Sequence, residues 1–362
     1  MVRSAASFQE RWPWLGPDLQ TLRDTIRPLP LPADRGEPIT IDLDSISVGP
    51  GPGAGPGPGA GQGAAGRGGR LLALHDPPTT GPAKGLVMVV HGLGGSSGRE
   101  GVRRQALNLQ QAGFAVLRLN LRGAGPGRAL AAGTYAASCN ADLLPVVAKA
   151  RALAGSLPLF GVGLSLGGTM LLNLLREQPQ ALDGLVTASS PLDLAACSQA
   201  IGQPRNWVYQ RWLLKRLVAQ TLADPFGVSG QERQALLLGR GPTTIRAFDA
   251  AITAPRWGYS SVDHYYAEAS PLASLLNDQS PSLAPLLLVH AADDPWVPVA
   301  ALHQLQSRLN PGVSGVNGVN QRGLEVCIPA KGGHNGFHGV GDGPLGSWSD
   351  ALAVEWLSAL VA

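Results

Sequence analysis

The feature that most constrains the fold is a glycine–serine–glycine turn between an apolar run and a helical pattern. The apolar run covers residues 157–162, and the helical pattern covers residues 169–177. Between them, Gly163, Ser165 and Gly167 match the G-x-S-x-G pattern of a nucleophile elbow, a strained strand-to-helix turn that exposes a serine hydroxyl. Side chains two residues from the serine would collide in so sharp a turn, and glycines remove them. The stretch therefore predicts a strand, a nucleophilic serine and a helix in succession.

A chance match and a nucleotide-binding loop are both weaker interpretations of this stretch. A chain with 48 glycines matches G-x-S-x-G by chance more often than most chains, but chance does not supply the strand before the motif and the helix after it. A dinucleotide-binding loop needs G-x-G-x-x-G, and Leu166 occupies the position of the third glycine. The chain also has no G-x-x-x-x-G-K-[ST] phosphate-binding loop. The nucleophile elbow therefore remains the prediction.

Charge and cysteine content argue against several function classes. The net charge of +3 over 362 residues is small and no long basic run is present, so nucleic-acid binding is not indicated. The three cysteines are odd in number and widely spaced, which predicts reduced thiols in a cytoplasmic protein and neither a disulfide framework nor a metal site. Residues 1–10 lack the apolar core of a signal peptide, and no apolar run approaches the ~20 residues of a membrane span. Peripheral contact with a membrane and the oligomeric state stay open.

The order of the apolar segments predicts one large α/β domain. A hydrophobic fraction of 44% is ample for its core. Short apolar or alternating runs, most of them followed by a helical pattern, predict eight mostly parallel strands flanked by helices. Between the sixth and seventh strands only helical patterns occur, which predicts a helical cap. The expected strands cover residues 39–43, 70–75, 86–90, 114–119, 157–162, 185–188, 285–290 and 324–328.

This pattern divides the chain into four segments. One of them contains residues 49–69, where glycine at nearly every second position and four prolines predict a flexible loop inserted between the first two strands. The expected organisation is an N-terminal lead-in at residues 1–36, the first part of the core at 37–190, the helical cap at 191–280 and the second part of the core at 281–362.

Three chemically suitable side chains follow three of the expected strands. Catalytic groups of doubly wound sheets gather at the carboxyl ends of the strands. Ser165 follows the fifth strand, His334 follows the eighth, and the pair Asp293 and Asp294 follows the seventh. The order serine, aspartate, histidine is that of the α/β-hydrolase triad. We expect Ser165 to attack a carbonyl, His334 to take and return its proton, and an aspartate to orient the imidazole.

The two adjacent aspartates cannot both face His334. Related hydrolases usually carry the acid in a D-x-x-V-P pattern, and Asp294 stands in that register before Pro298. Counting forward from the end of the strand favours Asp293 instead. Asp294 is therefore the predicted acid, and Asp293 is the alternative.

The expected enzyme also needs an oxyanion hole with two backbone N–H donors. Leu166, directly after the nucleophile, supplies one, and Leu93 in the glycine-rich loop after the third strand supplies the other. In the cap, the aromatic residues Trp212, Trp257 and Tyr265 are expected to wall an acyl pocket. Packing within the cap and contact with a membrane are the alternative roles for these residues.

Six short motifs are spread over nearly the whole chain. They are Asp-Leu-Gln-Thr-Leu at 18–22, His-Gly-Leu-Gly-Gly at 91–95, Gly-Leu-Ser-Leu-Gly-Gly at 163–168, Tyr-Tyr-x-x-x-Ser-Pro at 265–271, Asp-Asp-Pro at 293–295 and Gly-Gly-His-x-Gly-Phe at 332–337. Together they resemble the AB hydrolase 4 family, the YheT-like and embryogenesis-associated branch of the α/β-hydrolases. The resemblance implies a carboxylic-ester hydrolase, with some eukaryotic relatives acting on medium-chain acyl esters or phospholipids. The Gly/Pro stretch departs from the family pattern, which affects partner contacts and not the chemistry.

The sequence thus predicts an α/β-hydrolase fold and a serine esterase that needs no cofactor and no metal. Its expected substrate is a small-molecule or lipid ester with a short- to medium-chain acyl group. Two alternatives remain. An acyltransferase would use the same triad and pass the acyl group to an alcohol, whereas a non-catalytic ligand-binding protein would share only the fold.

Overall fold

The computed structural model contains one nine-stranded sheet. It describes residues 8–43, 68–239, 241–277, 284–309, 318–319, 323–343 and 345–362. All eight expected strands are present, and the two-residue β8 is an addition at the edge of the sheet. In chain order the strands are β1 (Glu37–Asp42), β2 (Arg70–Asp76), β3 (Leu86–Val90), β4 (Ala115–Asn120), β5 (Leu159–Leu164), β6 (Gly184–Ala188), β7 (Leu286–Val289), β8 (Gly318–Val319) and β9 (Leu324–Cys327).

The sheet is mostly parallel. Its spatial order is β1-β2-β4-β3-β5-β6-β7-β9-β8. The six strands β4, β3, β5, β6, β7 and β9 run parallel to one another. Strands β1, β2 and β8 pair antiparallel with their neighbours. Every residue of β3, β4 and β6 is buried, as expected for central parallel strands covered on both faces. The α/β-hydrolase fold expected from the sequence is confirmed.

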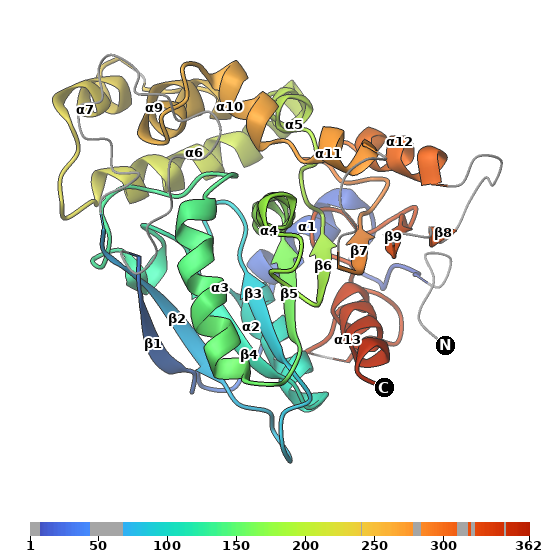
Figure 1. Cartoon of the computed structure of the whole chain (residues 1–362). Coiled ribbons are helices and arrows are strands. Elements are labelled where there is room, and N and C mark those ends of the chain that lie inside the picture. The colour runs from blue at the N-terminus through green and yellow to red at the C-terminus, as the bar shows by residue number, and fades with distance from the viewer. Residues whose placement is uncertain are drawn as a thin grey trace.

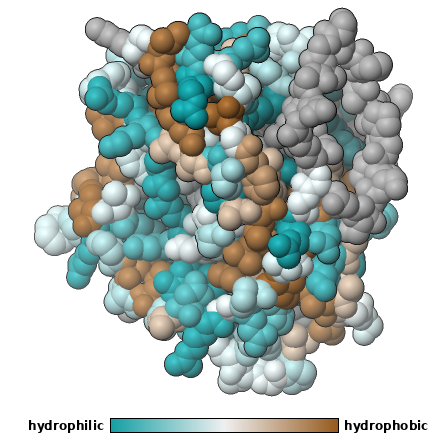
Figure 2. All heavy atoms as spheres, turned by 90° about the vertical axis from the view of Figure 1, so that its left-hand side faces the viewer, coloured by the Kyte–Doolittle hydropathy of each residue, from teal (hydrophilic) through white to brown (hydrophobic). Residues whose placement is uncertain are grey.

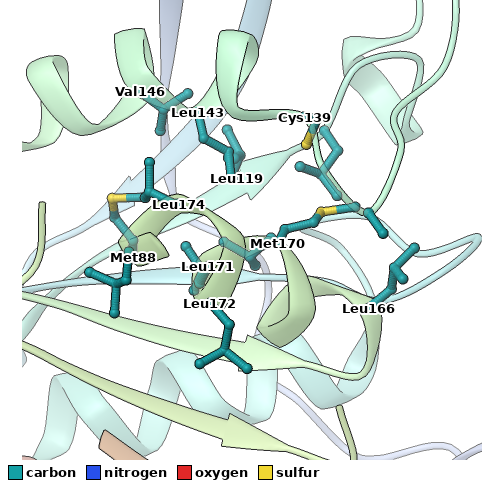
Figure 3. Close-up of a cluster of buried hydrophobic side chains, with 14 of the residues drawn as sticks. Met88, Leu119, Cys139, Leu143, Val146, Leu166, Met170, Leu171, Leu172 and Leu174 are labelled. Carbon is teal, nitrogen blue, oxygen red and sulfur yellow. The ribbon is translucent and has the colours of Figure 1, made fainter. Parts of the chain in front are cut away.

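Helices cover both faces of the sheet, and successive residues of a strand point to opposite faces. Val87 and Val89 of β3 belong to the core on one face, and Met88 and Val90 belong to the core on the other. Figure 3 shows Met88 among leucine and valine side chains of the core to which Met88 and Val90 belong. One face is covered by α2 (Glu100–Gln111) and α13 (Trp348–Leu360), and the other by α3 (Asn140–Ala154), α4 (Leu166–Glu177) and α12 (Ala300–Leu309) (Figure 1).

A group of helices between β6 and β7 forms the cap expected from the sequence. Figure 1 shows these helices gathered at the top of the view, beyond one end of the strands. They have a small core of their own, which includes Tyr209, Leu213 and Phe248. No strand occurs among the described residues of this segment. The cap helices are α5 (Leu194–Ile201), α6 (Trp207–Leu222), α7 (Gly230–Leu237), α8 (Ile245–Phe248), α9 (Ala254–Arg256), α10 (Val262–Ala269) and α11 (Leu272–Leu276), with a π-helical turn at Asp249–Thr253.

The N-terminal lead-in contains α1 (Pro17–Ile26), which precedes β1. The exact boundaries of the four segments stay a prediction, and residues 49–67 of the expected Gly/Pro loop lie outside the described residues. Each helix in the described part of the chain is too short or too polar to cross a membrane.

Candidate active site

Ser165 lies at the turn between β5 and α4 in a backbone conformation that few residues adopt. Its φ of 52° and ψ of −127° fall outside the regions that side-chain-bearing residues favour. A Cβ atom at Gly163 would come within 3.0 Å of the Gly168 backbone, and one at Gly167 would come within 3.0 Å of the Val90 carbonyl. The turn therefore requires glycine on both sides of the serine, for the steric reason expected from the sequence.

A chain of hydrogen bonds links Ser165 to His334 and His334 to Asp294. Ser165 Oγ lies 2.9 Å from His334 Nε2, and His334 Nδ1 lies 2.8 Å from Asp294 Oδ2. The other carboxylate oxygen, Oδ1, accepts hydrogen bonds from the backbone N–H groups of Trp296 at 2.8 Å and Val297 at 3.0 Å. With the carboxylate fixed in this way, Nδ1 of the imidazole donates to it and Nε2 is free to accept the serine proton.

Burial and the charge of His334 act in opposite directions on the pKa of Asp294. Its side chain is completely shielded from solvent, which alone would raise its pKa. The attraction of His334 and the hydrogen bond that this residue donates outweigh burial and hold the pKa of Asp294 below its usual value. Asp294 is therefore a carboxylate at neutral pH, which suits a group that stabilises an imidazolium.

Asp293 binds the loop that carries the histidine instead of the histidine ring. Its Oδ1 accepts a hydrogen bond from the Gly333 N–H at 3.0 Å, and its Oδ2 lies 3.9 Å from Lys331 Nζ. Burial raises the pKa of Asp293 above its usual value. Among the described residues, the aspartate in the D-x-x-V-P register is the one that contacts His334, and its neighbour anchors the turn.

Three further residues hold the histidine loop, and none of them was predicted from the sequence as part of the site. Thr21 Oγ1, from α1, accepts a hydrogen bond from the His334 N–H at 2.9 Å. Ser189 Oγ accepts one from the Asn335 N–H at 3.0 Å. The Trp296 ring stacks on the imidazole with the ring centroids 4.4 Å apart. The Asp-Leu-Gln-Thr-Leu motif, which contains the threonine, was the available signal for the role of α1.

The two expected oxyanion donors lie on loops that meet at the serine. A Cβ atom at Gly92 would lie 2.8 Å from Ser165 Cβ, so the loop after β3 approaches Ser165 directly. Leu93 follows in this loop, and Leu166 is the first residue of α4. Among the described residues, neither amide N–H of these leucines donates to a backbone or side-chain acceptor. Both amides are thus free to donate to a ligand.

His91 braces the loop that carries Leu93. The Leu121 N–H donates to His91 Nε2 at 3.3 Å, so the ring proton is on Nδ1 and is donated to the Gly92 carbonyl at 2.8 Å. Burial lowers the pKa of His91 to about 4, which keeps the ring neutral. His91 is therefore a hydrogen-bonded part of the loop.

A cavity of about 710 Å³ extends from the serine and the histidine into the space between the sheet and the cap. Trp212 from α6 and Tyr265 from α10 line this cavity. Trp257 lies outside the lining, because its indole N–H donates to the Thr134 carbonyl at 2.9 Å and its ring packs against the main core. Two of the three aromatic residues expected to wall a pocket are thus in a position to contact a ligand, and Trp257 is not.

The solvent-exposed surface of α6 carries aromatic and basic residues, and it includes part of the cavity-lining Trp212 side chain. Trp207 is 58% exposed and Trp212 is 43% exposed, and Arg211 lies over the Trp207 ring at 5.4 Å. Figure 2 shows hydrophobic side chains at the top of this view, at the level of the cap in Figure 1. Contact of this surface with a membrane stays a prediction.

The remaining predictions from the sequence concern metal ligands and thiols. In the ranges that the structure describes, no three His, Cys, Asp or Glu side chains are grouped so that they could hold a metal ion. Cys139, Cys197 and Cys327 are free thiols, and burial raises the pKa of each.

A family model matches the central part of the chain. The model is Hydrolase_4, described as serine aminopeptidase, S33, and it matches residues 81–313. This region covers more than half of the chain and includes Ser165 and Asp294, while His334 lies beyond its end.

Several known proteins are similar in sequence. The phospholipase ABHD3 of Bos taurus is 26% identical over 254 residues, which cover 69% of this chain and 58% of that protein. The embryogenesis-associated protein EMB8 of Picea glauca is 26% identical over 283 residues, covering 76% and 58%. The medium-chain fatty acid ethyl ester synthase/esterase 2 of Saccharomyces cerevisiae is 27% identical over 239 residues, covering 59% and 51%. The chain spans little more than half the length of these relatives.

Proposed function

We propose that this chain, which belongs to the Hydrolase_4 family (serine aminopeptidase, S33), is a serine hydrolase that cleaves carboxylic esters. The observation that carries the proposal is the continuous hydrogen-bonded chain from Ser165 through His334 to Asp294. The strained turn beneath the serine and the cavity in front of it support the same assignment. The relatives include proteins named as an esterase and a phospholipase, which favours ester bonds as the target.

The proposed reaction proceeds through an acyl-enzyme. Ser165 Oγ attacks the ester carbonyl carbon while its proton passes to His334 Nε2. The oxygen of the tetrahedral intermediate accepts hydrogen bonds from the N–H groups of Leu93 and Leu166. The C–O bond then breaks, the alcohol leaves with the proton from the imidazolium, and the acyl group stays on the serine. Water repeats the attack by the same route and releases the carboxylic acid.

The test is hydrolysis of a series of p-nitrophenyl esters from acetate to laurate. We expect turnover that is highest for short to medium acyl chains, because the cavity beside the serine is of ligand size and partly lined by apolar side chains. Folded protein that hydrolyses none of these esters would contradict the proposal.

Removal of the Trp212 side chain is expected to change chain-length preference. Trp212 lines the cavity, so Trp212→Ala enlarges the space for an acyl chain and should shift the highest kcat/KM towards longer esters. Trp207→Ala on the same helix is the matched control, since Trp207 is exposed and does not line the cavity. For both variants, kcat/KM is measured with the same series of p-nitrophenyl esters. An unchanged profile in Trp212→Ala, or the same shift in both variants, would contradict this role for Trp212.

A second proposed activity is transfer of the acyl group to an alcohol. The yeast relative is named as a synthase as well as an esterase, and the same acyl-enzyme serves both reactions. Product analysis in the presence of ethanol distinguishes them: an acyltransferase forms the ethyl ester in excess over free acid, whereas a hydrolase forms mainly the acid.

A cytoplasmic location, which the cysteine content led us to expect, is also a proposal.

A further inference from the structure

Two arginine side chains face the cavity without a carboxylate partner. Arg99, directly before α2, and Arg216, from α6, both line the cavity. Arg99 Nη2 and Arg216 Nε are shielded from solvent, and neither atom has a hydrogen-bond partner among the described residues. A buried guanidinium N–H without an acceptor costs free energy in the empty protein. This arrangement is explained if a ligand supplies the acceptor.

The position of Arg99 is unfavourable for a cation in the absence of a ligand. Arg99 is the N-cap residue of α2 and makes no side-chain capping hydrogen bond. The positive end of the helix dipole repels a cation at this position. Burial lowers the pKa of Arg99 despite the attraction of the adjacent Glu100, whose own carboxylate accepts a hydrogen bond from the Leu29 N–H at 3.1 Å. The guanidinium is thus attracted by Glu100, but among the described residues it forms neither an ion pair nor a side-chain hydrogen bond.

Other acidic side chains that line the cavity are bound to other groups. Asp24 forms an ion pair with Arg104 at 2.7 Å. Asp249 accepts hydrogen bonds from Thr253 at 2.7 Å and Tyr266 at 2.8 Å, and burial raises its pKa to about 6. These acids therefore do not neutralise the two arginines.

Both arginines lie next to the loop that approaches the serine. Arg216 Nη2 donates to the Gly94 carbonyl at 2.8 Å, one residue from the expected oxyanion donor Leu93. Arg99 follows the same loop and is close enough to His91 to contribute to the low pKa of that ring. A group bound by these arginines would therefore lie in the same cavity as the ester carbonyl that Ser165 attacks.

We propose that Arg99 and Arg216 bind an anionic group, a phosphate or a carboxylate, on the ester that Ser165 attacks. The inference rests on the proposed function, because it places this group on the substrate of the same site. Guanidinium groups match the oxygen geometry of both anions and form charge-assisted hydrogen bonds with them. The cavity would thus select amphiphilic esters with an anionic group over neutral esters of the same length.

The test compares the binding of hexyl phosphate, hexanoate and hexanol by calorimetry. We expect wild-type protein to bind at least one of the two anions more tightly than hexanol, and the stronger of the two identifies the anion. In Arg99→Gln the binding of that anion should weaken by about tenfold or more, because a charged hydrogen bond is lost. Arg99→Lys keeps the positive charge but not the forked donors of the guanidinium group. Its affinity for that anion should lie between those of wild type and Arg99→Gln. Arg233→Gln, an exposed cap arginine, is the matched control and should bind as wild type.

A structural role for Arg99 makes a different prediction. If Arg99 supported the fold, Arg99→Gln would lower the melting temperature of the ligand-free protein. We expect no loss, because the half-buried Arg99 side chain makes no hydrogen bond or ion pair in the described part of the chain. Equal anion binding by wild type and Arg99→Gln, or no preference of wild type for either anion over hexanol, would overturn the subsite. Binding does not depend on turnover, so anion binding without ester hydrolysis would refute only the proposed function.

Discussion

Replacement of Asp294 by asparagine is expected to lower kcat for ester hydrolysis by up to about 10⁴-fold. The carboxylate accepts the Nδ1 proton of His334 at 2.8 Å. An amide group at this position favours the tautomer with the proton on Nε2, which cannot accept the proton of Ser165. Asparagine still offers an oxygen to the backbone N–H groups of Trp296 and Val297, so the melting temperature should change little.

Asp293→Asn is the matched control for this substitution. It removes a charge one residue away, but Asp293 binds the Gly333 N–H and not the imidazole. We expect kcat close to the wild-type value, with any effect on stability in the range of roughly 0.5–2 kcal/mol for a side chain that anchors a turn. Kinetics and thermal melting of the two purified variants measure the difference. A large loss of kcat in Asp293→Asn with little loss in Asp294→Asn would move the acid role to Asp293.

Gly163→Ala is expected to destabilise the protein by about 3 kcal/mol or more. The added methyl group would come within 3.0 Å of the backbone of Gly168, at the start of α4, and neither backbone segment can move without displacing the serine. Activity should fall together with stability, since the same shift moves Ser165 away from His334. Urea denaturation and ester hydrolysis measure the two effects.

Gly230→Ala, at the start of α7, is the matched control. A Cβ atom at Gly230 meets nothing within 4 Å, so the unfolding free energy should stay within about 0.5 kcal/mol of the wild-type value. If Gly163→Ala kept the wild-type denaturation midpoint and activity, the steric account of the turn would be wrong.

The sequence was most informative where one physical requirement controls the residues. Strand β3 is buried on both faces, which is why it appears as a continuous apolar run in the sequence. The elbow glycines are predictable for a similar reason, because backbone atoms occupy the space that a side chain would need. A cap was predictable from the absence of strand patterns between β6 and β7.

Contacts between distant segments could not be read from the sequence in the same way. Thr21 supports the backbone of His334 across more than 300 positions. The Asp-Leu-Gln-Thr-Leu motif draws attention to this threonine, but it does not indicate which residue the threonine contacts. The choice between Asp293 and Asp294 depends on which way the turn after the strand directs each side chain. The D-x-x-V-P pattern of related hydrolases favoured Asp294, whereas counting residues from the end of the strand favoured Asp293. Trp257 was expected in the pocket because it is aromatic, yet the partner of its indole N–H, the Thr134 carbonyl, keeps it outside.

The central claim is that Ser165 is a nucleophile activated by His334, and covalent labelling with a fluorophosphonate tests it most directly. The serine oxygen attacks phosphorus, fluoride leaves, and the serine proton passes to the imidazole. Mass spectrometry of the intact protein and of its peptides should find one adduct, on Ser165. Ser165→Ala should give none, and Asp294→Asn should be labelled much more slowly than wild type. Folded wild-type protein that remains unlabelled, or labelling of Ser165→Ala at the wild-type rate, would contradict this claim.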